Sequence, residues 1–283
     1  MLSLDFSQKL NRINLTPDSL SYKGTPADAV FSQPCVAIVG SRKPTPYGRE
    51  VTKQLVMDLV KAGVVIISGL AFGIDSIAHT QALDSDGITV AVLPSGLEAI
   101  YPASHRGLAE KITEQGILIS EYPASHRPFK HDFLSRNRII AALSDVVIIP
   151  EAADRSGSLN TARQARDLGI PVYAVPGRLH DHMSRGTNHL IAHGDAKLCL
   201  SSEHVLKSLG LAGLTATEGA QKPSHLTNEQ LIIYELLEQG DLETSALQVK
   251  AGLPIDQILT HLTFLELNGL IQQNLIGAWH IQQ

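Results

Sequence analysis

The sequence has few of the features that mark secreted, membrane or metal-binding proteins. Only two of its 283 residues are cysteine, Cys35 and Cys199, and both lie in apolar runs without a CxxC spacing. Two buried thiols in a reducing compartment explain them better than a disulfide or a metal site. The N-terminus lacks a basic segment followed by an apolar one, and the longest apolar runs are too short to span a bilayer. We therefore expect a cytoplasmic protein without a membrane segment.

Charge and familiar catalytic motifs are also scarce. Charged residues make up 18% of the chain and apolar residues 43%, which indicates a folded globular protein, and the net charge is −5. There is no GxSxG or GxxxxGK motif, and no Cys–His or Ser–His–Asp set at a recognisable local spacing. Glu121 and Glu151 follow apolar runs and form a candidate carboxylate pair, but nothing near them supplies a second role. The segment His180–His182 fits a solvated loop better than a metal site. We expect no catalytic residue, metal or cofactor.

The sequence does contain a regular alternation of strand-like and helix-like segments across residues 35–210. Each strand-like run is apolar on both faces, as a parallel strand covered by helices requires. The alternation predicts an α/β domain with a doubly wound parallel sheet. We expect strands at CVAIVG, VVIISG, TVAVLPSG, ILISEY, DVVIIPE and PVYAVPG, and helices at residues 47–61, 74–83, 104–114, 133–143 and 159–168.

Three other segments surround this domain. Residues 1–34 are expected to form a short helical or irregular lead-in, and residues 211–225 a polar linker. In residues 226–283 three helix-like segments precede short strands ending in Trp279, which suits a small winged-helix domain with its turn at Gly252–Pro254. This tail has one basic and seven acidic residues, so a duplex would repel it and a protein-contact module is the better interpretation.

Polar residues gather where the predicted strands end, which is the edge where open α/β sheets bind ligands. The turn Gly40–Lys43 offers amides and basic groups to a phosphate, and a solvated turn fits it equally. The turn Ser68–Ala71 adds donors, whereas Asp75 suits a helix start with local hydrogen bonds better than a ribose contact. The turn Ser156–Thr161 is a third candidate anion site, although Ser158 is at least as well explained as an N-cap.

Basic and aromatic residues alternate in the segment Glu121–Arg138. Aromatic rings stack bases without regard to sequence while basic groups follow the backbone, and this combination is typical of single-strand binding. The alternative is that Phe133 and Arg136 begin a buried helix and bridge carboxylates. Lys130 lies in a polar loop and is harder to explain in that way.

Seven motifs in order, VGSR, SGLAFGIDSIAHTQAL, SGLEAIYP, ISEYP, RNRIIAALS, EAADRSGSLNTARQA and VPG, closely resemble the DprA/Smf family, the DNA-processing proteins of natural transformation. The resemblance implies an extended Rossmann fold and a cytoplasmic homodimer that binds single-stranded DNA without sequence preference. It also implies protection of incoming strands, help in loading a RecA-type recombinase, and no catalysis. The predicted DNA-binding residues are Gly40, Ser41, Arg42, Lys43, Ser68, Gly69, Leu70, Ala71, Phe129, Lys130, Phe133, Arg136, Asn137, Arg138, Ser156, Gly157, Ser158 and Thr161.

Two hypotheses from other classes remain. A Rossmann-like nucleotide-binding enzyme of the nucleoside-phosphate hydrolase type would need a PGGxGT-like turn followed by an acid. The nearest stretch, SGSLNTARQA with the following Arg166, has Gln164 and Arg166 but no acid, which counts against hydrolysis. The third hypothesis is an adaptor that acts through the acidic tail.

Overall fold

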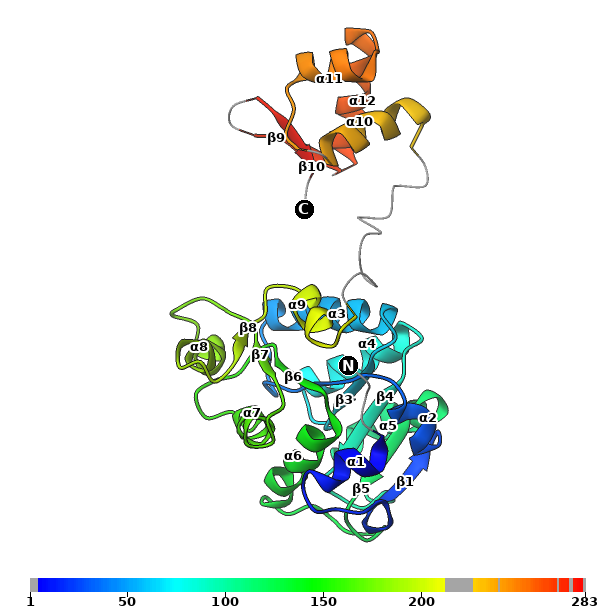
Figure 1. Ribbon diagram of the computed structural model, residues 1–283, viewed down its shortest axis with the longest axis vertical. Helices are drawn as coiled ribbons and strands as arrows, with labels where there is room; N and C mark the ends of the chain where they lie inside the picture. Colours follow the sequence, from blue (N-terminus) through cyan, green and yellow to red (C-terminus); the bar gives the residue numbers. More distant parts are fainter. Residues whose placement is uncertain (1–4, 212–225, 239, 269, 275–276, 282–283) are drawn as a thin grey trace. The chain divides into compact units, whose positions relative to one another are not determined.

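The six apolar runs predicted as strands lie in one sheet in the larger of two units, which span Met1–Thr215 and Ala216–Gln283 (Figure 1). The structure is a computed structural model that describes residues 5–211 and 226–281, except 239, 269 and 275–276. Almost all of the predicted linker, residues 211–225, is outside the described residues. The strands of the larger unit are β1 (Ser21–Gly24), β2 (Cys35–Ile38), β3 (Val65–Ser68), β4 (Thr89–Leu93), β5 (Ile117–Ser120), β6 (Val146–Ile149), β7 (Val172–Ala174) and β8 (Lys197–Leu198).

The sheet order is β1-β5-β4-β3-β2-β6-β7-β8, with β1 antiparallel to β5 and the other neighbouring pairs parallel. From β2 the chain adds β3, β4 and β5 on one side and then β6, β7 and β8 on the other. The strand order therefore reverses between β2 and β6. In doubly wound sheets the crevice for ligands opens at the carboxyl ends of the strands at this position.

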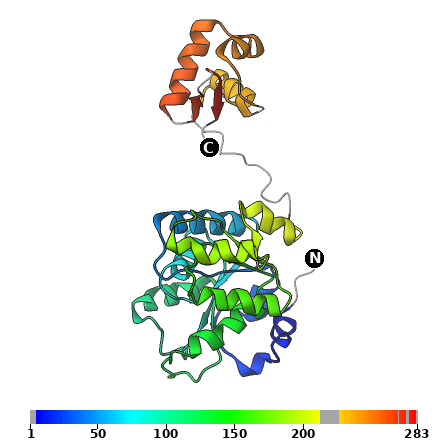
Figure 2. The ribbon, with the colours of Figure 1, turned by 90° about the vertical axis from the view of Figure 1, so that its left-hand side faces the viewer.

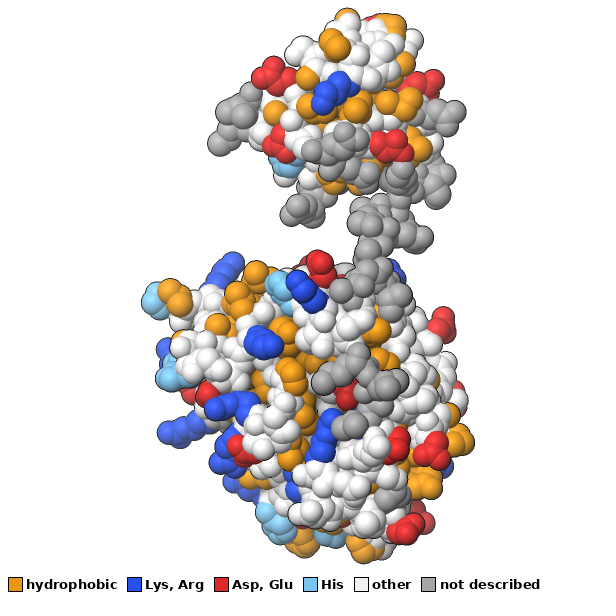
Figure 3. All heavy atoms as spheres, in the orientation of Figure 1, with side chains coloured by type: hydrophobic (Ala, Val, Ile, Leu, Met, Phe, Trp, Pro, Cys, Tyr) orange, Lys and Arg blue, Asp and Glu red, His pale blue; other side chains and the backbone are white. Residues whose placement is uncertain are grey.

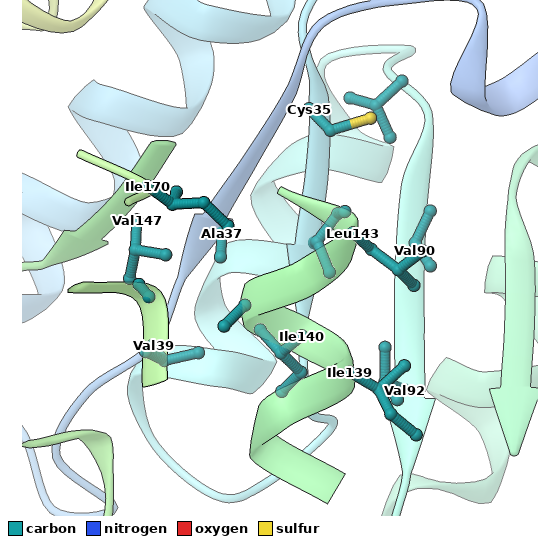
Figure 4. Packing of buried hydrophobic residues seen from close by; sticks show 14 of the residues in the cluster. Cys35, Ala37, Val39, Val90, Val92, Ile139, Ile140, Leu143, Val147 and Ile170 are labelled. Carbon is teal, nitrogen blue, oxygen red and sulfur yellow. The ribbon is translucent and has the colours of Figure 1, made fainter. Parts of the chain in front are cut away.

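Helices cover both faces of the sheet (Figures 1 and 2). Side chains alternate along each strand, so Cys35, Ala37 and Val39 face one layer while Val36 and Ile38 face the other. Figure 4 shows the first layer, where β2 and β4 pack against α6. The helices are α1 (Phe6–Asn11), α2 (Ala27–Phe31), α3 (Pro46–Lys61), α4 (Ile74–Asp84), α5 (Arg106–Gln115), α6 (Asp132–Leu143), α7 (Ser158–Asp167), α8 (Arg185–Ala192) and α9 (Ser202–Ser208).

The N-terminal segment, predicted as a lead-in, is part of the larger domain. Its α1 and α2 pack on the core, where the rings of Phe6 and Phe31 stack with centroids 4.8 Å apart. The fully buried Lys9 donates its Nζ to Oδ2 of Asp145 at 2.6 Å. All four residues of β1 are exposed. The sequence did not reveal this strand because an exposed edge strand carries no apolar pattern.

The smaller unit has its own core, in which Ile233, Leu247 and Leu262 are buried. It contains three helices followed by an antiparallel pair of strands, as the sequence predicted, although the second strand starts rather than ends at Trp279. The winged-helix assignment stays a prediction. The elements are α10 (Asn228–Glu238), α11 (Thr244–Ala251), α12 (Ile255–Leu267), β9 (Ile271–Gln273) and β10 (Trp279–Ile281).

Candidate functional site

A groove with a volume of about 1200 Å³ lies over the carboxyl ends of the strands at the reversal point. Its walls come from the turns after β2 and β6 and from the segment that leads into α6. Three segments that are far apart in the sequence therefore meet at one site. The predicted residues that line it are Gly40, Ser41, Arg42, Lys43, Ala71, Lys130, Phe133, Arg136, Asn137, Ser156, Gly157, Ser158 and Thr161.

The turn after β2 presents cations to the groove. The Arg42 guanidinium lies over the half-buried ring of Phe133, 5.0 Å from its centroid, and Phe133 in turn meets Tyr101 edge to face at 5.5 Å. Ser41 is buried, and its Oγ accepts a hydrogen bond from the Lys43 backbone N–H at 3.0 Å. In the described part of the chain, no carboxylate forms an ion pair with Arg42 or Lys43. Their charge is therefore available to an anion in the groove.

The turn after β3, predicted as a source of phosphate donors, uses its amides internally. The backbone N–H groups of Gly69 and Ala71 donate to Oδ2 of Asp75, at 3.2 and 3.4 Å, and the N–H of Leu70 donates to His79 at 3.3 Å. Ser68 is buried and donates its hydroxyl to the backbone of β2. The local role predicted for Asp75 is confirmed, and burial raises its pKa. Ser68, Gly69 and Leu70 are therefore structural residues here.

Arg136 and Arg138 also have partners inside the protein. Arg136 is 4% exposed, and its Nη1 donates to the backbone oxygens of Gly69, at 2.7 Å, and of Val92. Burial lowers the pKa of Arg136 to about 10. Arg138 forms an ion pair with Glu121. The alternative interpretation, in which α6 starts as a buried helix, describes Arg136 better than direct DNA contact does.

The turn before α7 forms the opposite wall. Gly157 is the N-cap of this helix and Ser158 its first residue, so Ser158 is not the cap. The hydroxyls of Ser156 and Ser158 are 2.7 Å apart, and Asn137 of α6 donates to the backbone oxygen of Gly157 at 3.3 Å. This contact ties α6 to the turn and fixes the width of the groove at that end.

The loop before α6 is ordered by a row of stacked rings. Tyr122 stacks on His126, and Phe129 stacks on His131, with centroids 4.6 and 5.9 Å apart. Asp132 accepts hydrogen bonds from His126 and from the N–H of Phe129, both at 2.8 Å. Phe129 is 63% exposed and lies outside the groove lining, whereas the next residue, Lys130, belongs to it.

The groove includes side chains that sequence reasoning missed, among them Tyr101, Arg155 and His182. A basic residue beside the third turn was the available signal for Arg155. Tyr101 lies in the motif SGLEAIYP and His182 in the segment His180–His182, but neither was predicted to bind DNA. The candidate carboxylate pair does not exist, since Glu121 follows β5 and Glu151 follows β6, with three strands between them. Among the described residues no cluster of three metal-ligating side chains occurs.

Figure 3 shows how charge is distributed on one face of the larger unit. Lys and Arg gather toward the side of α7 and α8, while Asp and Glu lie mostly on the other side. A local basic region thus exists although the chain as a whole is acidic, with a net charge of −5. None of the described helices is both long and apolar enough to cross a membrane.

The sequence profile of the family described as DNA recombination-mediator protein A matches residues 1–210. The chain belongs to this family. It is 40% identical over 250 residues to the putative DNA processing protein DprA of Mycobacterium tuberculosis, covering 87% of this chain and 64% of that protein. It is 42% identical over 197 residues to DNA processing protein DprA of Streptococcus pneumoniae, covering 70% and 68%. The chain thus spans somewhat under two thirds of the M. tuberculosis relative.

Solved structures of the family agree with the fold. DNA processing protein A of Streptococcus pneumoniae superposes with a TM-score of 0.66 at 38% identity, covering 72% of this chain and 70% of that one. The protein of Helicobacter pylori has the same TM-score, 0.66, at 36% identity, and covers 73% and 93%. The H. pylori structure is described for its single-stranded DNA binding mode. The predicted Rossmann-like α/β fold is therefore confirmed.

Proposed function

We propose that this chain binds single-stranded DNA in the groove at the strand reversal and serves DNA processing in natural transformation. The observation that carries the proposal is the juxtaposition of Arg42, Lys43 and Lys130 with the rings of Phe133 and Tyr101. Cations neutralise phosphates, and ring faces stack on unpaired bases. The described relative from H. pylori, which binds single-stranded DNA, supports the same ligand class.

Binding is proposed to be independent of base sequence. The phosphate backbone and the faces of the bases are the same in every sequence context, so cations and aromatic rings do not read base edges. Duplex DNA is a poorer ligand because its bases are already stacked on one another and cannot cover Phe133. On this proposal the protein is a binding protein without catalysis of its own.

Two wider roles follow from the family. As a member, the chain is proposed to act as a homodimer, to protect incoming strands and to help load a RecA-type recombinase. The smaller unit is the proposed protein-contact module, since α12 leaves Ile255 and Leu259 43% and 50% exposed in a segment with one basic and seven acidic residues. Leu259→Lys in the full chain should weaken recombinase binding and leave oligo-dT affinity unchanged.

The direct test is fluorescence anisotropy with oligo-dT and Arg42→Ala or Lys130→Ala. A hydrogen bond to a charged group is worth about 1.5–3 kcal/mol, so each variant should bind roughly tenfold or more weakly. Neither should lower the melting temperature, because both side chains are exposed. For each phosphate contact that is lost, the slope of log binding constant against log salt concentration should also become less steep by about 0.7.

Lys111→Ala is the matched control, since this exposed lysine lies on α5 and outside the groove lining. Wild-type affinity in both groove variants would refute the proposed site. Release of free base from nucleoside monophosphates would favour the hydrolase alternative instead. Equal affinity for single strand and duplex would contradict the stacking argument.

A further inference from the structure

The helix that follows β2 begins where Rossmann folds hold a nucleotide phosphate, at the strand reversal. In this chain a carboxylate of the protein itself, that of Glu151, lies at the start of this helix. Glu151 is 1% exposed and accepts two hydrogen bonds from the N-cap of α3: from the Thr45 backbone N–H to Oε2 at 2.8 Å, and from the Thr45 hydroxyl to Oε1 at 2.6 Å. A negative group at a helix N-terminus is favoured by the helix dipole.

The first turn of α3 is shaped to admit this carboxylate. Gly48 stands in that turn, and a Cβ at this position would lie 2.6 Å from Oε2 of Glu151. Glycine is a weaker helix former than alanine, so its presence inside a helix calls for a local reason. The reason here is room for the carboxylate.

Glu151 also holds the other end of the loop that carries Arg42 and Lys43. Its backbone oxygen accepts a hydrogen bond from the N–H of Ser41 at 2.8 Å, while its side chain binds Thr45. One residue thus fixes both ends of the segment from Ser41 to Thr45. Arg42 and Lys43, two of the cations of the groove, lie within this segment.

We propose that Glu151 is a positioning and specificity-determining residue. Its carboxylate takes the place of a nucleotide phosphate at the start of α3, closes that position to free nucleotides, and sets the loop that displays Arg42 to single-stranded DNA. The first two parts stand on the contacts of Glu151, and the last part rests on the proposed DNA binding.

The experiment compares the full chain with Glu151→Ala and Glu151→Gln. Removing the carboxylate should lower the melting temperature and weaken oligo-dT binding about tenfold. In Glu151→Ala, formate should restore part of the melting temperature and part of the oligo-dT affinity, because it can fill the space left by the carboxylate. Chloride at equal ionic strength should restore neither. Inorganic phosphate should raise the melting temperature of Glu151→Ala by more than that of the wild type. In Glu151→Gln the side-chain NH2 group replaces one of the two oxygens that accept from Thr45, so a donor would face a donor. The oligo-dT affinity of this variant should therefore also fall.

The control is Asp145→Asn. Asp145 directly precedes β6, at the end of the strand opposite to Glu151. It pairs with Lys9 and is not part of the groove lining. This variant should lose stability while its oligo-dT affinity and its response to formate stay those of the wild type. A general effect of destabilisation on DNA binding would appear in this variant too, and would overturn the positioning role.

Gly48→Ala supplies a second readout that does not depend on DNA. It should lower the melting temperature of the wild type, where the new methyl group would lie 2.6 Å from Oε2 of Glu151, and lower that of Glu151→Ala by clearly less, because only the Cβ of residue 151, 3.2 Å away, remains in contact there. The same change in both backgrounds, or no specific response to formate or phosphate, would overturn the proposed occupancy. If the wild type fails to bind oligo-dT, the proposed function fails, and the melting experiments still decide the role of the carboxylate at α3.

Discussion

Replacing Arg136 by methionine tests whether this residue supports the groove or contacts DNA. Methionine keeps an unbranched apolar stem and removes the guanidinium, which donates to the buried backbone oxygens of Gly69 and Val92. A hydrogen bond to a charged group is worth about 1.5–3 kcal/mol, and the buried oxygens would be left without this donor. The two bonds together therefore correspond to a loss of about 3–6 kcal/mol.

Part of this loss is offset because burial of the guanidinium is itself unfavourable; burial also lowers its pKa, to about 10. We expect a net loss of about 3 kcal/mol, which corresponds to a fall in melting temperature of roughly 6–12 °C for a unit of this size. The melting temperature of Arg136→Lys should lie between those of the wild type and Arg136→Met, because one ammonium group does not bridge two carbonyls as a planar guanidinium does.

The assay is thermal and urea unfolding of the full chain by far-UV circular dichroism, together with oligo-dT anisotropy below the transition. Trp279, the single tryptophan, is buried in the smaller unit, so its fluorescence follows that unit and should show an unchanged transition. Oligo-dT affinity should fall less than in Arg42→Ala. An unchanged melting temperature with a tenfold loss of affinity would refute the structural role and place Arg136 among the DNA contacts.

Two further predictions concern buried titratable side chains. His79 is fully buried, and burial lowers its pKa to about 3. Its Nδ1 lies 2.7 Å from the Thr89 hydroxyl, which donates its own hydrogen to a backbone oxygen, and its Nε2 accepts a hydrogen bond from the backbone N–H of Leu70. With one ring nitrogen donating and the other accepting, the ring is neutral. Below pH 6.5 the unfolded chain takes up a proton at this histidine that the folded chain does not. The free energy of unfolding should therefore fall by at most about 1.4 kcal/mol per pH unit from this residue as the pH drops towards 3. Urea unfolding at several pH values should show that the unfolding free energy of His79→Gln depends less steeply on pH. Lys9→Met should lower the free energy of unfolding by about 3 kcal/mol, because it leaves the Asp145 carboxylate without its main partner. The double variant Lys9→Met with Asp145→Asn should lose less than the sum of the two single changes, which urea unfolding of the three variants would measure. Full additivity of the two changes would contradict the pairing.

The sequence by itself determined the layered α/β architecture, because runs such as CVAIV and DVVII are apolar on both faces and only a sheet covered on two sides accepts them. It also located the turns of the site, since parallel strands bring their carboxyl ends to one edge. Edge strand β1 escaped prediction because its four residues are exposed and carry no pattern.

Only the tertiary structure decided which polar groups of those turns are free. In the sequence, Arg42 in a turn and Arg136 at the start of a predicted helix are both candidate DNA-binding residues. The fold leaves Arg42 exposed over Phe133 and buries Arg136 against the backbone oxygens of β4 and the turn after β3. Likewise Glu151 is a strand-end acid until β2 and β6 become neighbours and place it at the start of α3. Hydrogen-bond partners far apart in the chain depend on strand order, and local residue patterns do not record them.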